Sequence, residues 1–435
     1  MSQFQRARIL GLLAVVGGLA ILTACGGTST SSSKMAPVVT QPGGYDQLQY
    51  SMAYSQAIGG FLSASSQNKV QALMFPVLGP SNQNYTDFMT NILPNISGVS
   101  VSMQWNQIES TNAAGTGSGG YDFTAFDASI APYLAATAAG GKPARVNLIV
   151  WAATEGGNNA PGSGGSTPAY VFTPQWATTC CGAAPLDMAV CSSYTGDSGN
   201  PFYSQATSGG GGGSWNVNTS SDLSGLPVSY EPPFMVAFQS FIAQVIAHYN
   251  MPGAPKIGYI RFGFSQGGED SPECNQYWPG YSHDTYLSYV QTMTTFVRAQ
   301  NPSTAILADL HAVGPPGSVD YSYADDEAAY AVADNFGFGT NGLQQSDVTN
   351  FAANQPCDSD WCSLFDADHT LVPTLSLQTL QWSDPTGVAQ TGSLAVIIPF
   401  AQAHFANNLE LYLPDVALAY SFANYCNYPH AVCGN

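Results

Sequence analysis

Positive charge is scarce in this sequence. Only 9 of its 435 residues are lysine or arginine, against 28 aspartates and glutamates, so the net charge is −19 at pH 7 although only 9% of the residues are charged. A surface this acidic repels phosphate backbones and anionic membranes. Nucleic acid and anionic polysaccharides are therefore poor candidates for partners, and a neutral ligand is favoured.

Two signatures of bound groups are also missing. The chain has no glycine-rich phosphate loop of the dinucleotide-binding type. It has no CxxC pair beside its six scattered histidines, and such a pair is the usual starting point of a zinc site. We therefore predict no cofactor and no metal site.

Long apolar stretches are missing except at the N-terminus. There, Arg6 and Arg8 precede an apolar run from Ile9 to Ile21, and small residues lead to Cys25. A charged start, an apolar core and small residues are typical of an export signal. A transmembrane helix is the weaker alternative, because the run is short and interrupted by glycines.

Leu22-Thr23-Ala24-Cys25 resembles the lipobox of bacterial lipoproteins. The resemblance implies a signal peptide over 1–24, lipidation of Cys25 and a flexible tether over 25–40. Gly26 after the cysteine implies sorting to the outer membrane. The lipid anchor would be the only membrane contact, and loss of Arg6 and Arg8 leaves a mature charge of −21.

Eight cysteines remain after Cys25, and an even set in an exported chain favours disulfides. Cys357 with Cys362, and Cys426 with Cys433, are plausible local pairs. We expect Cys180 and Cys181 to pair with different partners, because a disulfide between neighbouring residues is strained.

Apolar, strand-like runs recur eight times in residues 41–435, which we predict to form a single domain. They lie at Ala72–Leu78, Val99–Trp105, Val146–Trp151, Ile257–Phe264, Ala305–Leu310, Asn335–Phe338, Thr374–Leu380 and Leu409–Leu413. Helical patterns separate most of them, as parallel strands require. The sixth connection, from Phe338 to Thr374, has the weakest helical pattern.

Eight such units predict a closed (β/α)8 barrel, also called a TIM barrel, with an open doubly wound sheet as the alternative. The clearest helix begins at Pro232 and Pro233. A long insertion at about 152–230 follows strand three and contains the glycine run 209–213. We expect it to cover part of a cleft, or else to lie on the solvent side without a role.

Active sites of such barrels lie at the carboxyl ends of the strands. The polar and aromatic residues at those ends, which we predict to bind substrate, are Trp105, Asn106, Trp151, Gln266, His311, Gln378, Trp382 and Tyr412. Aromatic faces stack on sugar rings, and amides bind sugar hydroxyls. A neutral carbohydrate is therefore the favoured substrate class.

The fourth run provides the strongest candidate for a reactive group. In Ile257–Asp270, IGYIRFGFSQGGED, a buried strand ends in two glycines that let the chain turn sharply before Glu269. We predict that Glu269 is a functional acid in a cleft. The bland alternative is a loop carboxylate that pairs with Arg261.

Several motifs together resemble the clan of (β/α)8 glycoside hydrolases that includes cellulase-like and β-galactosidase-like enzymes. They are QWNQIES followed by YDFTAFDASI, then VNLIVWAA, IRFGFSQGGED, LSLQTLQWSD and LELYLPD, and they span most of the mature chain in order. The resemblance implies a general acid/base at Glu269, where Gly268-Glu269 replaces the usual Asn-Glu pair. It also implies a glutamate nucleophile ending strand seven, but Ser376 or Gln378 stands there.

Glycoside cleavage ordinarily needs two carboxylates. Alternation along Asn408–Tyr412 places Glu410 and Tyr412 on one face, so Glu410 is our preferred second catalytic residue. A hydrogen bond inside the barrel is the equally weighted alternative for Glu410, and Glu155 and Asp270 are lesser candidates. Without a strand-seven carboxylate, a non-catalytic glycan-binding lipoprotein is the competing function.

Overall fold

The protein is described by a computed structural model for residues 47–153, 165–186, 188–190, 225–270, 272, 280–311, 323–380, 391–428 and 431. The chain divides into two units, Met1–Gln41 and Pro42–Asn435, and all of the described residues belong to the second. Cys25, Glu155 and Trp382 lie outside the described residues, as do the side chain of Gln266 and most of the insertion.

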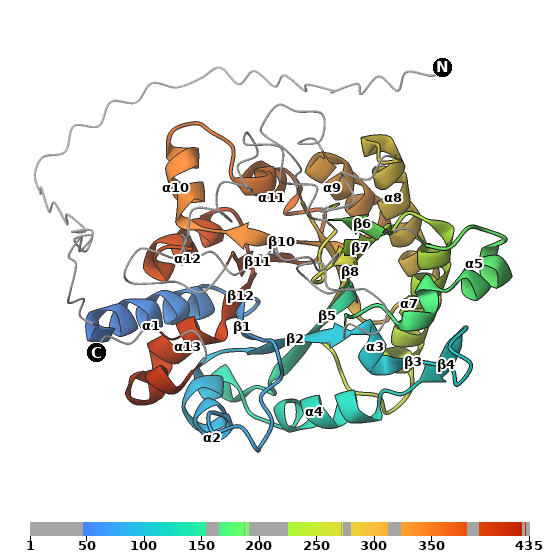
Figure 1. The fold of residues 1–435 in the computed structure, drawn as a ribbon. Helices are drawn as coiled ribbons and strands as arrows, with labels where there is room; N and C mark the ends of the chain where they lie inside the picture. Colours follow the sequence, from blue (N-terminus) through green and yellow to red (C-terminus); the bar gives the residue numbers. More distant parts are fainter. Residues whose placement is uncertain are drawn as a thin grey trace, which may run out of the picture. The chain divides into compact units, whose positions relative to one another are not determined.

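The second unit is a closed barrel of eight parallel strands. Their order around the barrel is β1, β12, β11, β10, β9, β8, β5 and β2, so neighbours follow the chain and the last strand pairs with the first. Figure 1 shows the ring of strands with helices arranged outside it. The predicted (β/α)8 fold is confirmed, and the open-sheet alternative is wrong.

The barrel strands are β1 (Lys69–Met74), β2 (Gly98–Gln104), β5 (Arg145–Ala153), β8 (Tyr259–Gln266), β9 (Ala305–Asp309), β10 (Gly337–Leu343), β11 (Leu375–Thr379) and β12 (Asn408–Tyr412). The other strands form two small sheets, β3 (Glu109–Thr111) with β4 (Ser118–Tyr121), and β6 (Met188–Val190) with β7 (Gly225–Pro227). All eight predicted barrel runs coincide with a strand, although the bounds differ by a few residues.

The longer helices are α1 (Gln47–Ala64), α4 (Thr124–Leu134), α7 (Pro232–Asn250), α8 (His283–Ala299), α9 (Tyr323–Asp334), α12 (Leu394–Ala403) and α13 (Leu413–Tyr420). Shorter ones are α2 (Tyr85–Asp87) with the π-helix η1 (Phe88–Ile92), α3 (Trp105–Ile108) and α5 (Pro174–Cys181). The sixth connection, whose helical pattern was weak, contains α10 (Gln345–Ala352) and α11 (Trp361–Asp368). Each has only 8 residues, too few for a clear amphipathic pattern. One-turn 3₁₀ segments are η2 (Leu93–Asn95), η3 (Ala139–Gly141), η4 (Ala169–Phe172) and η8 (Asp358–Asp360), and η9 (Phe422–Asn427) follows α13.

The strands bury both faces, but the two faces differ in chemistry. Residues that point outward, such as Val70, Ala72 and Met74 of β1, belong to the continuous apolar core between strands and helices. Their alternates point into the barrel. The buried interior set is Gln71, Leu73, Ser100, Asn147, Ile149, Tyr259, Arg261, Leu307, Asp309, Ser376, Gln378, Asn408 and Glu410.

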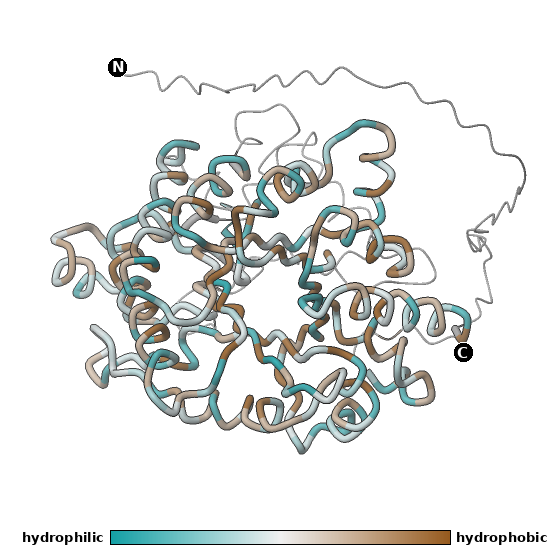
Figure 2. Tube along the Cα trace, turned by 180° about the vertical axis from the view of Figure 1, so that it is seen from behind, coloured by the Kyte–Doolittle hydropathy of each residue, from teal (hydrophilic) through white to brown (hydrophobic). Residues whose placement is uncertain are grey.

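This interior is unusually polar for a barrel, because branched apolar residues normally fill such a space. Figure 2 shows hydrophobic and hydrophilic residues mixed around the ring of strands. Buried polar groups are costly unless they are hydrogen-bonded, so these side chains must form a network. The charged members of that network define the candidate site.

The structure contains the predicted disulfide between Cys357 and Cys362, with Cα atoms 5.9 Å apart. It also joins Cys180 to Cys181 at the end of α5, so the expectation that these two pair with different partners is wrong. Cys426 is disulfide-bonded as well. Among the described residues, no helix has both the length and the apolarity needed to cross a bilayer.

Candidate active site

A tight turn after β8 places Glu269 at the mouth of the barrel. Gly267 and Gly268 both have positive φ angles, 52° and 83°, which glycine adopts without strain. The turn is held by the Ser265 amide, which donates to the Glu269 carbonyl at 3.1 Å, and by the Gly267 amide, which donates to the Ala153 carbonyl at 3.0 Å. The Glu269 side chain is thereby brought inward and is only 7% exposed.

Close backbone contact fixes this turn against the strand. A Cβ atom on Gly263 would lie 2.2 Å from the Cα of Gly268 and 2.3 Å from the amide nitrogen of Glu269. A Cβ atom on Gly268 would lie 2.1 Å from the Ile149 side chain and 3.3 Å from the Trp151 ring. The glycines of FGFSQGGED therefore allow the turn to pack closely against the strand, and this close packing positions Glu269.

Replacing Gly263 with alanine is expected to displace Glu269 without unfolding the barrel. The new methyl group must push the turn backbone outward, because it cannot pass through Gly268. We expect at least a tenfold loss of any Glu269-dependent activity and a loss of about 1–3 kcal/mol in stability from overpacking. Gly79→Ala is the matched control, because a Cβ there meets nothing within 4 Å. Unchanged activity in Gly263→Ala would contradict this account of the turn.

The Glu269 carboxylate accepts a hydrogen bond from the side-chain amide of Asn341 on β10. Asn341 was not among the predicted site residues, and the barrel brings it to Glu269. An amide donor orients the carboxyl group and leaves its second oxygen for other contacts. Glu269 therefore follows the carboxyl end of β8 and exposes little surface.

Below Glu269, the buried cation Arg261 organises the interior. Arg261 on β8 is 2% exposed. Its Nη2 donates to Oε1 of Gln378 at 2.7 Å, and its Nη1 donates to Oε2 of Glu410 at 3.2 Å. The same Nη1 lies 3.7 Å from Oδ1 of Asp309. The contacts of Arg261 are therefore with groups deeper in the barrel than Glu269, although its charge also acts on Glu269.

Glu410 lies inside the barrel and is fully buried. Besides Arg261, it accepts a hydrogen bond from the hydroxyl of Tyr259. Burial, together with the charge of Glu410, raises the pKa of that phenol well above its usual range, so Tyr259 keeps its proton. These contacts match the barrel-interior alternative for Glu410. Gln378, predicted to bind substrate, is likewise engaged by Arg261 in this network.

Two buried aspartates complete the set of acids. Asp270 is 1% exposed and accepts a hydrogen bond from the Phe264 amide at 2.7 Å. Burial, and then the charge of Asp309, raises the pKa of Asp270 well above the usual value. Asp309, which our sequence analysis missed, lies at the end of β9 and is fully buried. A charged residue inside the apolar run Ala305–Leu310 was the signal, because unpaired acids are rarely buried.

One predicted substrate-binding aromatic is misplaced. Trp105 is fully buried against Phe238 and Phe241 of α7, and its Nε1 donates to Glu109 at 2.5 Å. It begins α3, which turns it onto the helix side, so it presents no face to a ligand. The expectation for Trp105 is wrong: it rested only on the position of Trp105 at the end of the strand, whereas alternation from Val101 and Met103 directs this side chain toward the helices.

Of the other predicted contacts, Trp151 and Tyr412 lie near the carboxyl ends of their strands. Trp151 is partly buried beside Phe75, with ring centres 5.6 Å apart, and Tyr412 is partly buried at the end of β12. Asn106 instead binds the insertion, since its amide nitrogen donates to the Ser166 carbonyl at 2.7 Å. Its side chain donates to the carbonyl of Gly165.

His311 follows β9 and is half-buried. Its amide donates to Glu327 at 2.9 Å. Burial lowers the pKa of its imidazole to about 4, so the ring is neutral at ordinary pH. A neutral ring can accept as well as donate a hydrogen bond, which suits a sugar hydroxyl.

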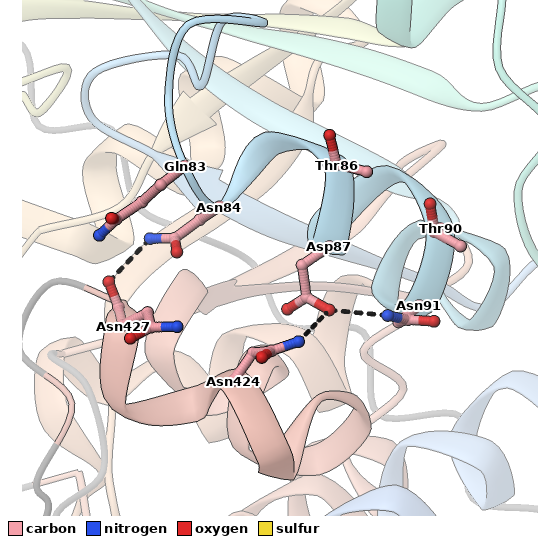
Figure 3. A pocket seen from close by; sticks show the side chains of 8 residues that line it. All are labelled: Gln83, Asn84, Thr86, Asp87, Thr90, Asn91, Asn424 and Asn427. Carbon is pink, nitrogen blue, oxygen red and sulfur yellow. Dashed lines mark hydrogen bonds between the residues drawn. The ribbon is translucent and has the colours of Figure 1, made fainter.

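A separate hollow of about 340 Å³ is lined by Gln83, Asn84, Thr86, Asp87, Thr90, Asn91, Asn424 and Asn427. Figure 3 shows Asn91 and Asn424 pointing at the Asp87 carboxylate, and Asn84 reaching Asn427. Burial opposes ionisation of Asp87, but hydrogen bonds from Ser421, Asn91, Asn424 and Tyr428 lower its pKa. The hydrogen bonds among its lining residues therefore join η9 to α2. None of the predicted site residues lines this hollow.

Metal binding finds no support in the described parts of the chain, which contain no cluster of three or more histidine, cysteine, aspartate or glutamate residues that could hold an ion. What the mouth does provide is the carboxyl group of Glu269, amide and imidazole groups, and a partly buried tryptophan. This set can bind hydroxyl groups and transfer a proton.

Comparisons with known proteins add little to this description. No protein-family model and no curated protein matches the chain. Among solved structures, the exo-beta-1,4-mannosidase Op5Man5 from Opitutaceae bacterium strain TAV5 is similar, with a TM-score of 0.39 and 14% sequence identity. The match covers 80% of this chain and 52% of that one, so the chain spans about half the length of the mannosidase. The class that the structure itself defines is the (β/α)8 barrel, from the closure of its eight strands.

Proposed function

We propose that this protein is a glycoside hydrolase that cleaves a neutral polysaccharide or oligosaccharide, with Glu269 donating a proton to the glycosidic oxygen. The observation that carries the proposal is the position of Glu269 at the barrel mouth, 7% exposed and held by Asn341. A carboxyl group with limited access to water is suited to hold and release a proton. The acidic net charge of the chain also favours an uncharged substrate.

The reaction needs a second carboxylate to attack the anomeric carbon or to activate water. We propose Glu410 for this role, with Glu155 as the second candidate, in line with the sequence analysis. Arg261 holds the Glu410 carboxylate at 3.2 Å, while full burial separates Glu410 from the mouth. Glu155 follows β5 and lies outside the described residues. Asp270 is a lesser candidate, because burial raises its pKa and so disfavours the ionised form that a base requires.

One observation favours the competing function of a non-catalytic glycan-binding protein. Ser376 is buried in β11, where it accepts a hydrogen bond from Asn408 at 2.7 Å, and it supplies no carboxylate on this strand. A binding protein would need the aromatic and amide groups of the mouth but no second acid.

Reducing-sugar release from a panel of neutral polysaccharides separates the two functions. The chain starting after Ser33 is assayed beside its Glu269→Gln, Glu410→Gln and Glu155→Gln variants, together with binding to each polymer. We expect release by the parent and a strong loss in Glu269→Gln with binding retained. Glycan binding without release by any of the proteins would refute the hydrolase and establish the binding protein.

We also propose that the protein is anchored in the bacterial cell envelope through a lipid on Cys25, with the outer membrane as the destination. The basic start, the apolar run and the small residues before Cys25 support this, and the Ser/Thr-rich segment after it suits a tether. Metabolic labelling with a palmitate analogue is expected to mark the full chain and not Cys25→Ser. Equal labelling of both would contradict the anchor.

A further inference from the structure

Asp309 is a buried carboxylate that the proposed reaction leaves without a role. It is fully buried, and neither of its carboxylate oxygens has a hydrogen-bond partner among the described residues. The nearest opposite charge is Nη1 of Arg261 at 3.7 Å. Burying a carboxylate without hydrogen bonds is costly, so Asp309 does not contribute to stability in the way that Glu410 does.

The groups around Asp309 are few and can be named element by element. Strand β8 contributes Arg261, the turn after it contributes Asp270, and β12 contributes Glu410. Strand β10 contributes only Gly339, directly paired with Asp309 in register. A Cβ atom on Gly339 would lie 3.9 Å from the Arg261 side chain, so this glycine leaves room for the guanidinium.

These neighbours shift the titration of Asp309 toward neutral pH. Burial raises its pKa to about 7, the charge of Arg261 opposes this rise, and the charge of Glu410 adds to it. The backbone amide of Asp270, outside hydrogen-bond geometry, slightly favours the ionised form. Since the folded-state pKa is above that of an exposed aspartate, this group makes the fold less stable as pH rises from about 4 to about 7.

Arg261 links Asp309 to Glu269. Its guanidinium bonds Glu410 and Gln378 and faces Asp309, and its charge also acts on Glu269. Three acids thus share one cation within the barrel. When one of them gains or loses its charge, the field that Arg261 exerts on the others is less or more compensated.

We propose that Asp309 is a positioning residue for Glu269: when Asp309 is ionised it offsets the positive charge of Arg261, and Glu269 then retains the proton that it donates. The proposal rests on the proposed role of Glu269 as general acid. Asp309 acts through Arg261 and does not touch the substrate, because it is fully buried. This explains why a carboxylate without hydrogen bonds occupies the end of β9, next to the mouth.

An Asp309→Asn variant removes the charge and keeps the shape. Arg261 is then less compensated above neutral pH, its field favours the ionised Glu269, and the proton is lost at lower pH. We expect the basic limb of the kcat/KM profile to move down by on the order of one pH unit, with little change in KM. The variant should fold, because asparagine avoids the cost of a buried charge.

Two measurements test the proposal on the full chain. The first is the pH profile of hydrolysis by the parent, by Asp309→Asn and by Asp347→Asn. Asp347 is a matched control, a fully buried aspartate that caps α10 and bonds Trp361, away from the barrel interior. The second is the titration of the Glu269 carboxyl carbon by ¹³C NMR, with its signal identified by Glu269→Gln. In the parent we expect a second inflection near the pH at which Asp309 ionises, and its absence in Asp309→Asn.

The outcomes separate this proposal from the proposed function. An unchanged basic limb in Asp309→Asn, or a Glu269 titration identical in the parent and the variant, would overturn the role of Asp309. Absence of hydrolysis by the parent would refute the hydrolase alone, since the NMR titration still decides whether Asp309 controls the charge at Glu269. An equal shift in Asp347→Asn would show a general effect of buried charge and would also overturn the proposal.

Discussion

Replacing Glu269 with glutamine is expected to lower turnover of the natural glycan by about 10²–10⁴-fold, the range that general acid catalysis contributes. Glutamine has nearly the same shape and can still bond Asn341, but it has no acidic proton to give to the leaving oxygen. Binding should be little changed, so the loss should appear in kcat rather than in KM. The measurement is steady-state hydrolysis at the pH optimum of the parent.

A change of leaving group makes this prediction specific. An aryl glycoside with an acidic phenol leaves without full protonation, so Glu269→Gln should lose much less activity on it than on the glycan. Glu109→Gln is the control, because Glu109 is a buried glutamate that binds Trp105 and Tyr170. An equal loss on both substrates would point to misfolding or to another role for Glu269.

Truncating Glu410 to alanine is expected to cost about 3–5 kcal/mol of stability, because it leaves the buried guanidinium of Arg261 without its closest anion. Tyr259 would lose its acceptor at the same time. The double variant Glu410→Leu with Arg261→Met removes both charges and should recover most of the loss. Chemical denaturation followed by circular dichroism measures both effects.

The loss of stability caused by Glu410→Ala should also be smaller at higher pH. The charge of Glu410 helps to raise the pKa of Asp309 to about 7 in the parent, so Asp309 ionises at a lower pH once Glu410 is gone. Between pH 5 and pH 8 the ionisation of Asp309 therefore destabilises the parent more than the variant. Glu410→Ala should therefore be less destabilising at pH 8 than at pH 5, relative to the parent at the same pH. A cost below about 1 kcal/mol at both pH values would show that the ion pair is not needed for the fold.

Local patterns were sufficient to predict the barrel and much of its mouth. The eight apolar runs, the start of α7 at Pro232 and the turn before Glu269 are properties of short segments, and the structure confirms them. The disulfide between Cys357 and Cys362 was also predictable, since 5 positions separate the two residues. The single domain and the lipid anchor remain predictions.

The errors concern the direction in which a side chain points and the partner with which a cysteine pairs. Trp105 was placed in the mouth because it ends the predicted strand, whereas it lies on the helix-facing side with Val101 and Met103 and begins α3. Cys180 and Cys181 were expected to bond elsewhere, and the structure joins them to each other. Glu410 was placed on the correct face, but the sequence could not tell a cleft from the closed interior of the barrel.

By itself, the sequence determined the number and order of the strands, the inward direction of Glu410, and the turn that carries Glu269, because all of these depend on residues close together in the chain. Only the tertiary structure decided which polar groups meet. Arg261 and Glu410 are separated by 149 positions, and Asn341 and Glu269 by 72. Their contacts depend on the closure and register of the barrel, which bring the third residue of β8 and the third of β12 to the same interior space. The buried cation Arg261 and the four acids around it are therefore a product of closure, and the proposed control of Glu269 by Asp309 follows from that arrangement.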